Sequence, residues 1–118
     1  VARRLAEEHL LNPARYWLPH PVPSTAADEP AFHAGRLGRL IPRYWRGPTW
    51  LFATVPLLEG LMRAGRDDAA RQLAARTARL VARHGMREYY NPITGEGLGA
   101  HRFATSAVVV DAVERTLG

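Results

Sequence analysis

The sequence predicts an all-α fold in which buried and solvent-facing helices alternate. Four segments carry helical periodicity, and a nearly all-apolar one at 48–62 is followed directly by an amphipathic one at 68–84. A helix that is apolar on every side is normally buried, whereas an amphipathic helix covers it. This alternation is expected where inner helices line a barrel and outer helices surround them. Four helices cannot close such a barrel, so we expect it to be incomplete within these 118 residues.

The composition indicates one globular domain at most. Hydrophobic residues make up 47% of the chain and charged residues 23%, values typical of a soluble domain. All 16 basic residues are arginine, and with 11 acidic residues they give a formal charge of +5. Cysteine is absent, which excludes disulfides, thiolate metal sites and a thiol nucleophile.

The first third of the chain predicts one short helix and a long loop. Residues 2–11 carry apolar side chains at helical spacing, and Asn12-Pro13 ends the helix because the residue before a proline disfavours the α conformation. From 12 to 47 prolines recur without periodicity, which favours a functional or covering loop. Gly47-Pro48 then predicts a helix start, with glycine as N-cap and proline in the first turn.

The middle of the chain predicts two antiparallel helices. The first is the apolar string PTWLFATVPLLEGLM, with Gly65 as a C-cap, and the second runs over 68–84 with Asp67 as N-cap and Gly85 at its end. The second helix should bury one stripe and expose its arginines. That stripe contains Ala70, Leu73, Thr77, Leu80, Val81 and His84.

The last third predicts an irregular stretch and a final helix. Asn91-Pro92 and three glycines interrupt 86–103, so we expect no regular structure there. Residues 104–117 form a helix in this interpretation, although the run at 108–110, Val-Val-Val, would also suit a strand. The helix is preferred because the surrounding pattern is helical.

Neither a membrane nor a nucleic acid is the expected partner. The longest apolar run is shorter than the roughly 20 residues that span a bilayer, and it contains Glu59. No signal peptide is visible at the start of this chain, and we expect a cytoplasmic protein. The arginines between 66 and 87 are interleaved with acids and read as a solvated helix face, while a basic nucleic-acid-binding helical domain ranks last because its motifs are absent.

The loops carry the chemistry that the helices lack. They contain Trp45, Trp50 and Tyr89, and also acidic and basic side chains, a combination that favours a carbohydrate site. Two alternatives remain open from the residues alone: the tryptophans could be core residues, and Glu88 could pair with Arg87 or Arg102. The five histidines show no ligand spacing, so no metal is proposed, and no cofactor motif occurs.

Three strings in these segments resemble the C-terminal portion of glycoside hydrolase family 63. They are YWRGPTW at 44–50, LLEGL at 57–61 and EYYNPITGEGLG at 88–99. The resemblance covers roughly 12–111 and includes processing α-glucosidases and bacterial mannosylglycerate and glucosylglycerate hydrolases, with trehalases as distant relatives. It implies that 1–118 is a C-terminal fragment of a single (α/α)6-barrel catalytic domain.

The resemblance also implies an inverting reaction by two carboxyl groups, one protonating the leaving oxygen and one activating water. Glu88 matches the family's general base, and the general acid is an aspartate upstream of every matched residue. The expected substrate-binding residues are Trp45, Arg46, Trp50, Tyr89 and Glu96. The family commonly shows Phe-x-Trp-Ser/Thr where this chain has Phe-Ala-Thr-Ser at 103–106, which leaves the substrate open.

The function expected is hydrolysis of small α-linked glucosides or mannosides, without a cofactor. The partners are a carbohydrate substrate and the missing upstream part of the barrel, and we expect the 118-residue segment by itself to be inactive. The alternative is a catalytically inactive carbohydrate-binding relative that keeps the fold, and the upstream aspartate distinguishes the two.

Overall fold

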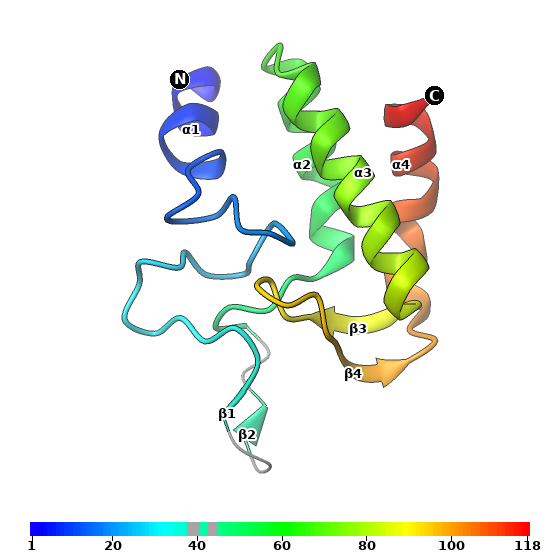
Figure 1. The fold of residues 1–118 in the computed structure, drawn as a ribbon. Helices are drawn as coiled ribbons and strands as arrows, with labels where there is room; N and C mark the ends of the chain where they lie inside the picture. Colours follow the sequence, from blue (N-terminus) through cyan, green and yellow to red (C-terminus); the bar gives the residue numbers. More distant parts are fainter. Residues whose placement is uncertain (38–40, 43–44) are drawn as a thin grey trace.

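The computed structural model describes residues 1–37, 41–42 and 45–118 (Figure 1). The helical elements are α1 (Ala2–Leu5), the π-helical turn η1 (Ala6–Leu10), α2 (Leu51–Arg63), α3 (Asp67–His84), the 3-10 helix η2 (Ala104–Val108) and α4 (Val109–Leu117). The strands are β1 (Arg36–Leu37), β2 (Ile41–Pro42), β3 (Arg87–Tyr90) and β4 (Gly97–His101). Strand β1 pairs with β2, and β3 pairs with β4, each as an antiparallel two-stranded sheet. The helices α2, α3 and α4 lie side by side, and the long loop and both hairpins lie beyond one end of them (Figure 1).

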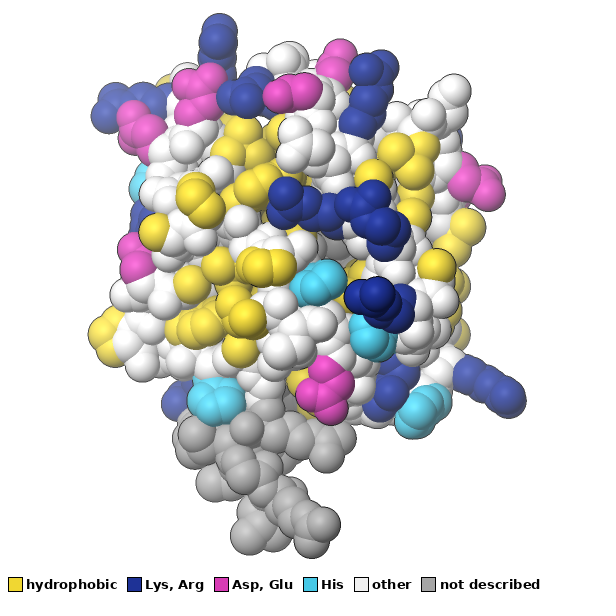
Figure 2. Space-filling model, in the orientation of Figure 1, with side chains coloured by type: hydrophobic (Ala, Val, Ile, Leu, Met, Phe, Trp, Pro, Cys, Tyr) yellow, Lys and Arg dark blue, Asp and Glu magenta, His cyan; other side chains and the backbone are white. Residues whose placement is uncertain are grey.

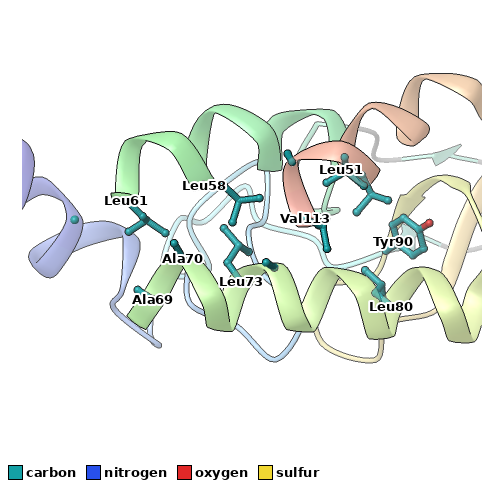
Figure 3. Packing of buried hydrophobic residues seen from close by; sticks show 13 residues of the cluster. Leu51, Leu58, Leu61, Ala69, Ala70, Leu73, Leu80, Tyr90 and Val113 are labelled. Carbon is teal, nitrogen blue, oxygen red and sulfur yellow. The ribbon is translucent and has the colours of Figure 1, made fainter. Parts of the chain in front are cut away.

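The main core lies between α2, α3 and α4 (Figure 3). Leu58 of α2 lies opposite Leu73 of α3, Leu61 lies opposite Ala70, and Val113 of α4 belongs to the same buried cluster. Small residues on α3, among them Ala70, let the helices approach closely. Each fully buried leucine contributes roughly 1.5–3 kcal/mol relative to an exposed one, so this contact supports the whole helical layer.

The predictions for α3 are confirmed apart from a shift of one residue at its start and the half-buried state of Val81 and His84 at the end of the expected stripe. The helix begins at Asp67, so this residue lies in the first turn and is not the N-cap. Its negative charge there interacts favourably with the helix dipole. The expected stripe is buried at Ala70, Leu73, Thr77 and Leu80. Gly85 ends the helix with a φ of 74°, a conformation that glycine adopts without strain.

The predicted start of α2 at Pro48 is wrong, because the helix begins at Leu51. Thr49 lies in an extended segment and pairs with Tyr90 as an isolated antiparallel bridge. Its N–H donates to the Tyr90 carbonyl at 2.8 Å, and its carbonyl accepts from the Tyr90 N–H at 2.9 Å. This non-local pairing overrides the local helix signal, and α2 then runs without interruption through Pro56.

The prediction of an irregular stretch over 86–103 is also wrong, since β3 and β4 form a hairpin there. The fold is therefore helical with two small sheets, and not purely all-α. Tyr89 and Tyr90 favour a strand, and Gly97 permits close packing, since a Cβ there would lie 2.5 Å from Cγ of Arg87. Asn91-Pro92 and Gly95 do lie in a turn, the one that joins β3 to β4, whereas Gly97 and Gly99 lie within β4 and allow side chains to approach. The valine run at 108–110 is helical, as preferred.

The expectation that α2 is buried on every side is met on one side only. Leu51, Thr54, Leu58 and Leu61 are buried, whereas the Met62 side chain is 40% exposed. An apolar cavity of about 550 Å³ also lies between α2 and the segment formed by α1 and η1. Among the helices of the described part, none combines the length and the apolar character needed to cross a bilayer.

Truncating the central core leucine tests this packing. We expect Leu73→Ala to lower the free energy of unfolding by about 2–5 kcal/mol, because it leaves a cavity between α2 and α3. The exposed neighbour Gln72→Ala is the control and should change it by no more than about 0.5 kcal/mol. Urea denaturation measures both, and equal effects would contradict the core assigned to α3.

Candidate active site

The bridge between Thr49 and Tyr90 brings the two sequence motifs together. Thr49 is fully buried, and its side-chain hydroxyl donates to the His20 carbonyl at 2.8 Å. The segment leading into α2, the strand β3 and the long N-terminal loop are therefore joined at one residue. Trp50 and Tyr89, which follow and precede the paired residues, come to lie next to each other.

The aromatic side chains form a stacked row. The rings of Trp45 and Trp50 are nearly parallel, 4.2 Å apart with an interplanar angle of 6°, and Trp50 stacks on Tyr89 at 5.1 Å. Phe52 meets both tryptophans edge-on at about 6 Å. Trp50 and Tyr89 are only 7% and 3% exposed, but Trp45 is 57% exposed. Trp50 thus belongs to a small core, as the core alternative predicted, while Trp45 keeps an aromatic surface in contact with solvent.

Glu88 lies at a β-bulge in the hairpin. Arg87 pairs with His101 whereas Tyr89 pairs with Leu98, so two residues of β4 lie opposite the single residue Glu88. A bulge re-aims side chains, and bulges are common beside active sites. The sequence patterns did not reveal this irregularity, because neither strand was predicted.

Gly99 in the bulge is what gives the Glu88 side chain its space. Gly99 has a φ of 68°, which disfavours other residues. A Cβ at this position would lie 2.5 Å from Oε2 of Glu88 and 2.7 Å from Cε1 of Tyr89. The carboxylate and the tyrosine ring therefore flank the same glycine, which places Glu88 beside the aromatic row.

The Glu88 carboxylate is held by the backbone of β4. The N–H of Ala100 donates to Oε2 at 2.9 Å. Within 1–37, 41–42 and 45–118, Glu88 takes part in no ion pair, so pairing with Arg87 or Arg102 is not observed. Arg87 instead donates through Nη2 to the Gly99 carbonyl at 2.9 Å. The Glu88 side chain is thus half-exposed, with Oε2 held by the backbone of β4.

The strand that carries Glu88 is anchored on both sides of it. The Tyr90 hydroxyl donates to the Gly85 carbonyl at 2.5 Å and accepts from the Arg87 N–H at 2.9 Å. The hydroxyl of Ser106, in η2, donates to the Arg87 carbonyl at 2.7 Å. Burial raises the pKa of Tyr90, so its phenol stays protonated and remains a donor. Tyr90 and Ser106 were not predicted as site residues, although both lie inside or next to the motifs.

The other two predicted residues stand apart from this row. Arg46 is exposed, and its backbone carbonyl accepts from the His33 N–H. Glu96 is exposed in the turn between β3 and β4, where its carbonyl accepts from the Asn91 N–H at 2.9 Å. The structure therefore brings together Glu88, the two tryptophans and Tyr89, whereas the side chains of Arg46 and Glu96 form no hydrogen bond or ion pair with other residues of the described ranges. Tyr44, the first residue of the YWRGPTW motif, lies outside the described residues.

The site forms an open surface in this chain. The cavities of about 550 and 740 Å³ are lined by other residues. Among the residues that the structure describes, no group of three or more histidine and carboxylate side chains is placed to hold a metal ion. The chemistry available on this surface is that of one carboxylate beside an aromatic face.

The family model and the similar proteins agree on one family. Residues 1–106 match the family model described as the mannosylglycerate hydrolase MGH1-like glycoside hydrolase domain. A curated mannosylglycerate hydrolase of Thermus thermophilus is 38% identical over 96 residues, and mannosylglycerate hydrolase MGH1 of Selaginella moellendorffii is 36% identical over 88. These alignments cover 81% and 75% of this chain but only 20% and 17% of the relatives.

The structure resembles solved proteins over the same region. The crystal structure of a GH63 mannosylglycerate hydrolase from Thermus thermophilus in complex with glucose superposes with a TM-score of 0.70 and 32% identity. The match covers 97% of this chain and 25% of that structure. The chain thus spans about a quarter of the solved protein that it resembles.

Two glycines with the same backbone conformation separate backbone strain from the contact with Glu88. Gly99→Ala and Gly65→Ala should each cost about 1–2 kcal/mol of stability, because both glycines have φ near 70°. Only Gly99→Ala also pushes against Glu88 and Tyr89, whereas a Cβ at Gly65 meets nothing within 4 Å. Denaturation curves should show the larger loss for Gly99→Ala, and equal losses would contradict the bulge geometry.

Proposed function

Because the chain belongs to the mannosylglycerate hydrolase MGH1-like glycoside hydrolase family, we propose that it is part of an inverting hydrolase of small α-linked glucosides or mannosides. The observation that carries the proposal is Glu88, which lies at a bulge, bonded to the Ala100 N–H and next to the aromatic row. The names of the relatives favour a mannoside or glucoside of glycerate as the substrate.

Glu88 acts as the general base in this proposal. Its carboxylate takes a proton from a water molecule while the water oxygen attacks the anomeric carbon from the face opposite the leaving group. The bond from that carbon to the leaving oxygen breaks, and an acid protonates the oxygen. In inverting enzymes the two carboxyl groups are about 6.5–9.5 Å apart, and each contributes about 10²–10⁴-fold to the rate.

The aromatic row forms one wall of the proposed sugar site. The exposed ring of Trp45 can stack on the C–H surface of a sugar, and Trp50 and Tyr89 keep that ring in place from behind. In this proposal the guanidinium group of Arg46 and the carboxylate of Glu96 form hydrogen bonds with the sugar hydroxyls. Proton transfer between carboxyl groups and water needs no cofactor.

The acid belongs to a part of the protein outside these 118 residues. We propose that 1–118 is the C-terminal portion of one (α/α)6-barrel catalytic domain, located in the cytoplasm. The exposed side of α2 and the apolar cavity beside η1 are where upstream helices would pack. The short coverage of the relatives supports this arrangement, and the isolated segment should be inactive.

Replacing the proposed base tests the function in the complete protein. Glu88→Gln keeps the size and the acceptor for the Ala100 N–H but cannot take a proton from water. We expect kcat on mannosylglycerate or glucosylglycerate to fall by about 10²–10⁴-fold. The exposed Glu114→Gln on α4 is the matched control and should retain full activity.

Two results would overturn this function. Near-normal turnover by Glu88→Gln would exclude it as the base. A wild-type protein that binds the sugar without hydrolysing it would instead be the inactive relative with the same fold. The stability of both variants, followed by thermal unfolding, separates a chemical loss from a folding loss.

The domain proposal has its own test. The mass of the protein purified from its source should be several times the 13.1 kDa of this segment, because the matched region is only 20% of the Thermus thermophilus relative. Intact-mass spectrometry measures it. A protein of about 13 kDa would contradict both the barrel and the enzyme.

A further inference from the structure

A second cavity, of about 740 Å³, lies between α3 and the loop around His20. Its lining contains five basic side chains and no acidic one, together with Pro19, Leu80 and Ala82. The basic residues are Arg76, Arg79, Arg83, His20 and His84. Figure 2 shows histidine and arginine side chains gathered over α3 on the face in view. We call these eight residues the basic pocket.

The pocket combines a helical repeat with a distant loop. Arg76, Arg79 and Arg83 are spaced i, i+3 and i+7, which puts them on one face of α3. His20 comes from a loop far earlier in the chain, and its backbone N–H donates to the Pro92 carbonyl at 2.9 Å. The Thr49 hydroxyl holds the His20 carbonyl as well. From the sequence alone, the arginines are interpreted as a solvated helix face. In the structure the loop at His20 borders this face, and the two together line a partly open hollow.

Charge in the basic pocket is not balanced by carboxylates. Every ion pair found in the described ranges involves other residues, so the three arginines have no acidic partner there. Arg76 is oriented by neutral groups, since it donates to the Leu18 carbonyl at 3.1 Å and lies 5.3 Å from the Trp17 ring centre. Desolvation lowers the pKa of His20, and the charges of His84, Arg76 and Arg83 lower it further.

We propose that the basic pocket binds a small phosphorylated molecule. One guanidinium group can donate two parallel hydrogen bonds to the oxygens of a phosphate, and an imidazole N–H adds a further donor. The volume lies within the range of about 300–1,000 Å³ typical of small-molecule sites and exceeds what a phosphate group fills. Pro19, Leu80 and Ala82 would contact the organic part. A hollow of this size suits a small ligand better than a nucleic acid, which needs an extended basic track.

Isothermal titration calorimetry on the complete protein tests this site, with ribose 5-phosphate, inorganic phosphate and ribose as probes. Ribose 5-phosphate should bind most tightly, inorganic phosphate more weakly, and ribose not at all. The double variant Arg79→Gln with Arg83→Gln should weaken binding of ribose 5-phosphate by about tenfold or more, the equivalent of about 1.4 kcal/mol. Arg71→Gln, an exposed arginine of α3 outside the basic pocket, is the matched control and should bind as the wild type does.

Thermal unfolding verifies that the variants are folded, and the exposed Arg83→Gln alone replaces the double variant if the latter is unstable. The proposal is overturned if the wild type binds neither phosphate probe, or if binding survives loss of the arginines. An equal weakening by Arg71→Gln would also overturn it, because it would show a general charge effect. Hydrolysis does not enter this readout, so the result is independent of the role of Glu88.

Discussion

The pairing of Thr49 with Tyr90 is the constraint on which the rest of the structure depends. Both residues are fully buried, and their two backbone hydrogen bonds join the start of α2 to β3. A buried backbone group without its partner would cost about 1–3 kcal/mol, so the pair fixes where α2 begins. It also sets Trp50 against Tyr89 and, through the Tyr90 hydroxyl, holds the strand that carries Glu88.

The bulge opposite Glu88 sets the direction of the side chains on this frame. In a regular strand Glu88 and Tyr89 would point to opposite faces, but here both side chains lie against Gly99. A carboxylate therefore stands beside an aromatic row that ends in the exposed ring of Trp45. In the proposed function these two short segments supply one half of an acid–base pair and one wall of a sugar site, so the proposed reaction needs the remainder of the barrel.

The two faces of the helical layer differ in the side chains that they present to their surroundings. The cavity between α2 and η1 is lined mostly by apolar side chains, which suits packing against more protein. The outer side of α3 is rich in arginine, and there the loop at His20 creates a polar hollow. The same helical layer thus separates a face suited to completing the fold from a face suited to binding an anion.

The sequence by itself determined which segments are helical and where the family motifs lie, because these depend on local spacing: the stripe through Leu73, the end at Gly85 and the string that begins at Glu88. Only the tertiary structure decided the start of α2, the β3–β4 hairpin with its bulge, and the closing of the arginine face by His20. Each depends on hydrogen bonds between segments that are not adjacent in the chain, such as the one between Thr49 and Tyr90. Local propensity contains no information about such partners, so Gly97 and Gly99, which the sequence assigns to an irregular stretch, serve within β4 as points of close approach.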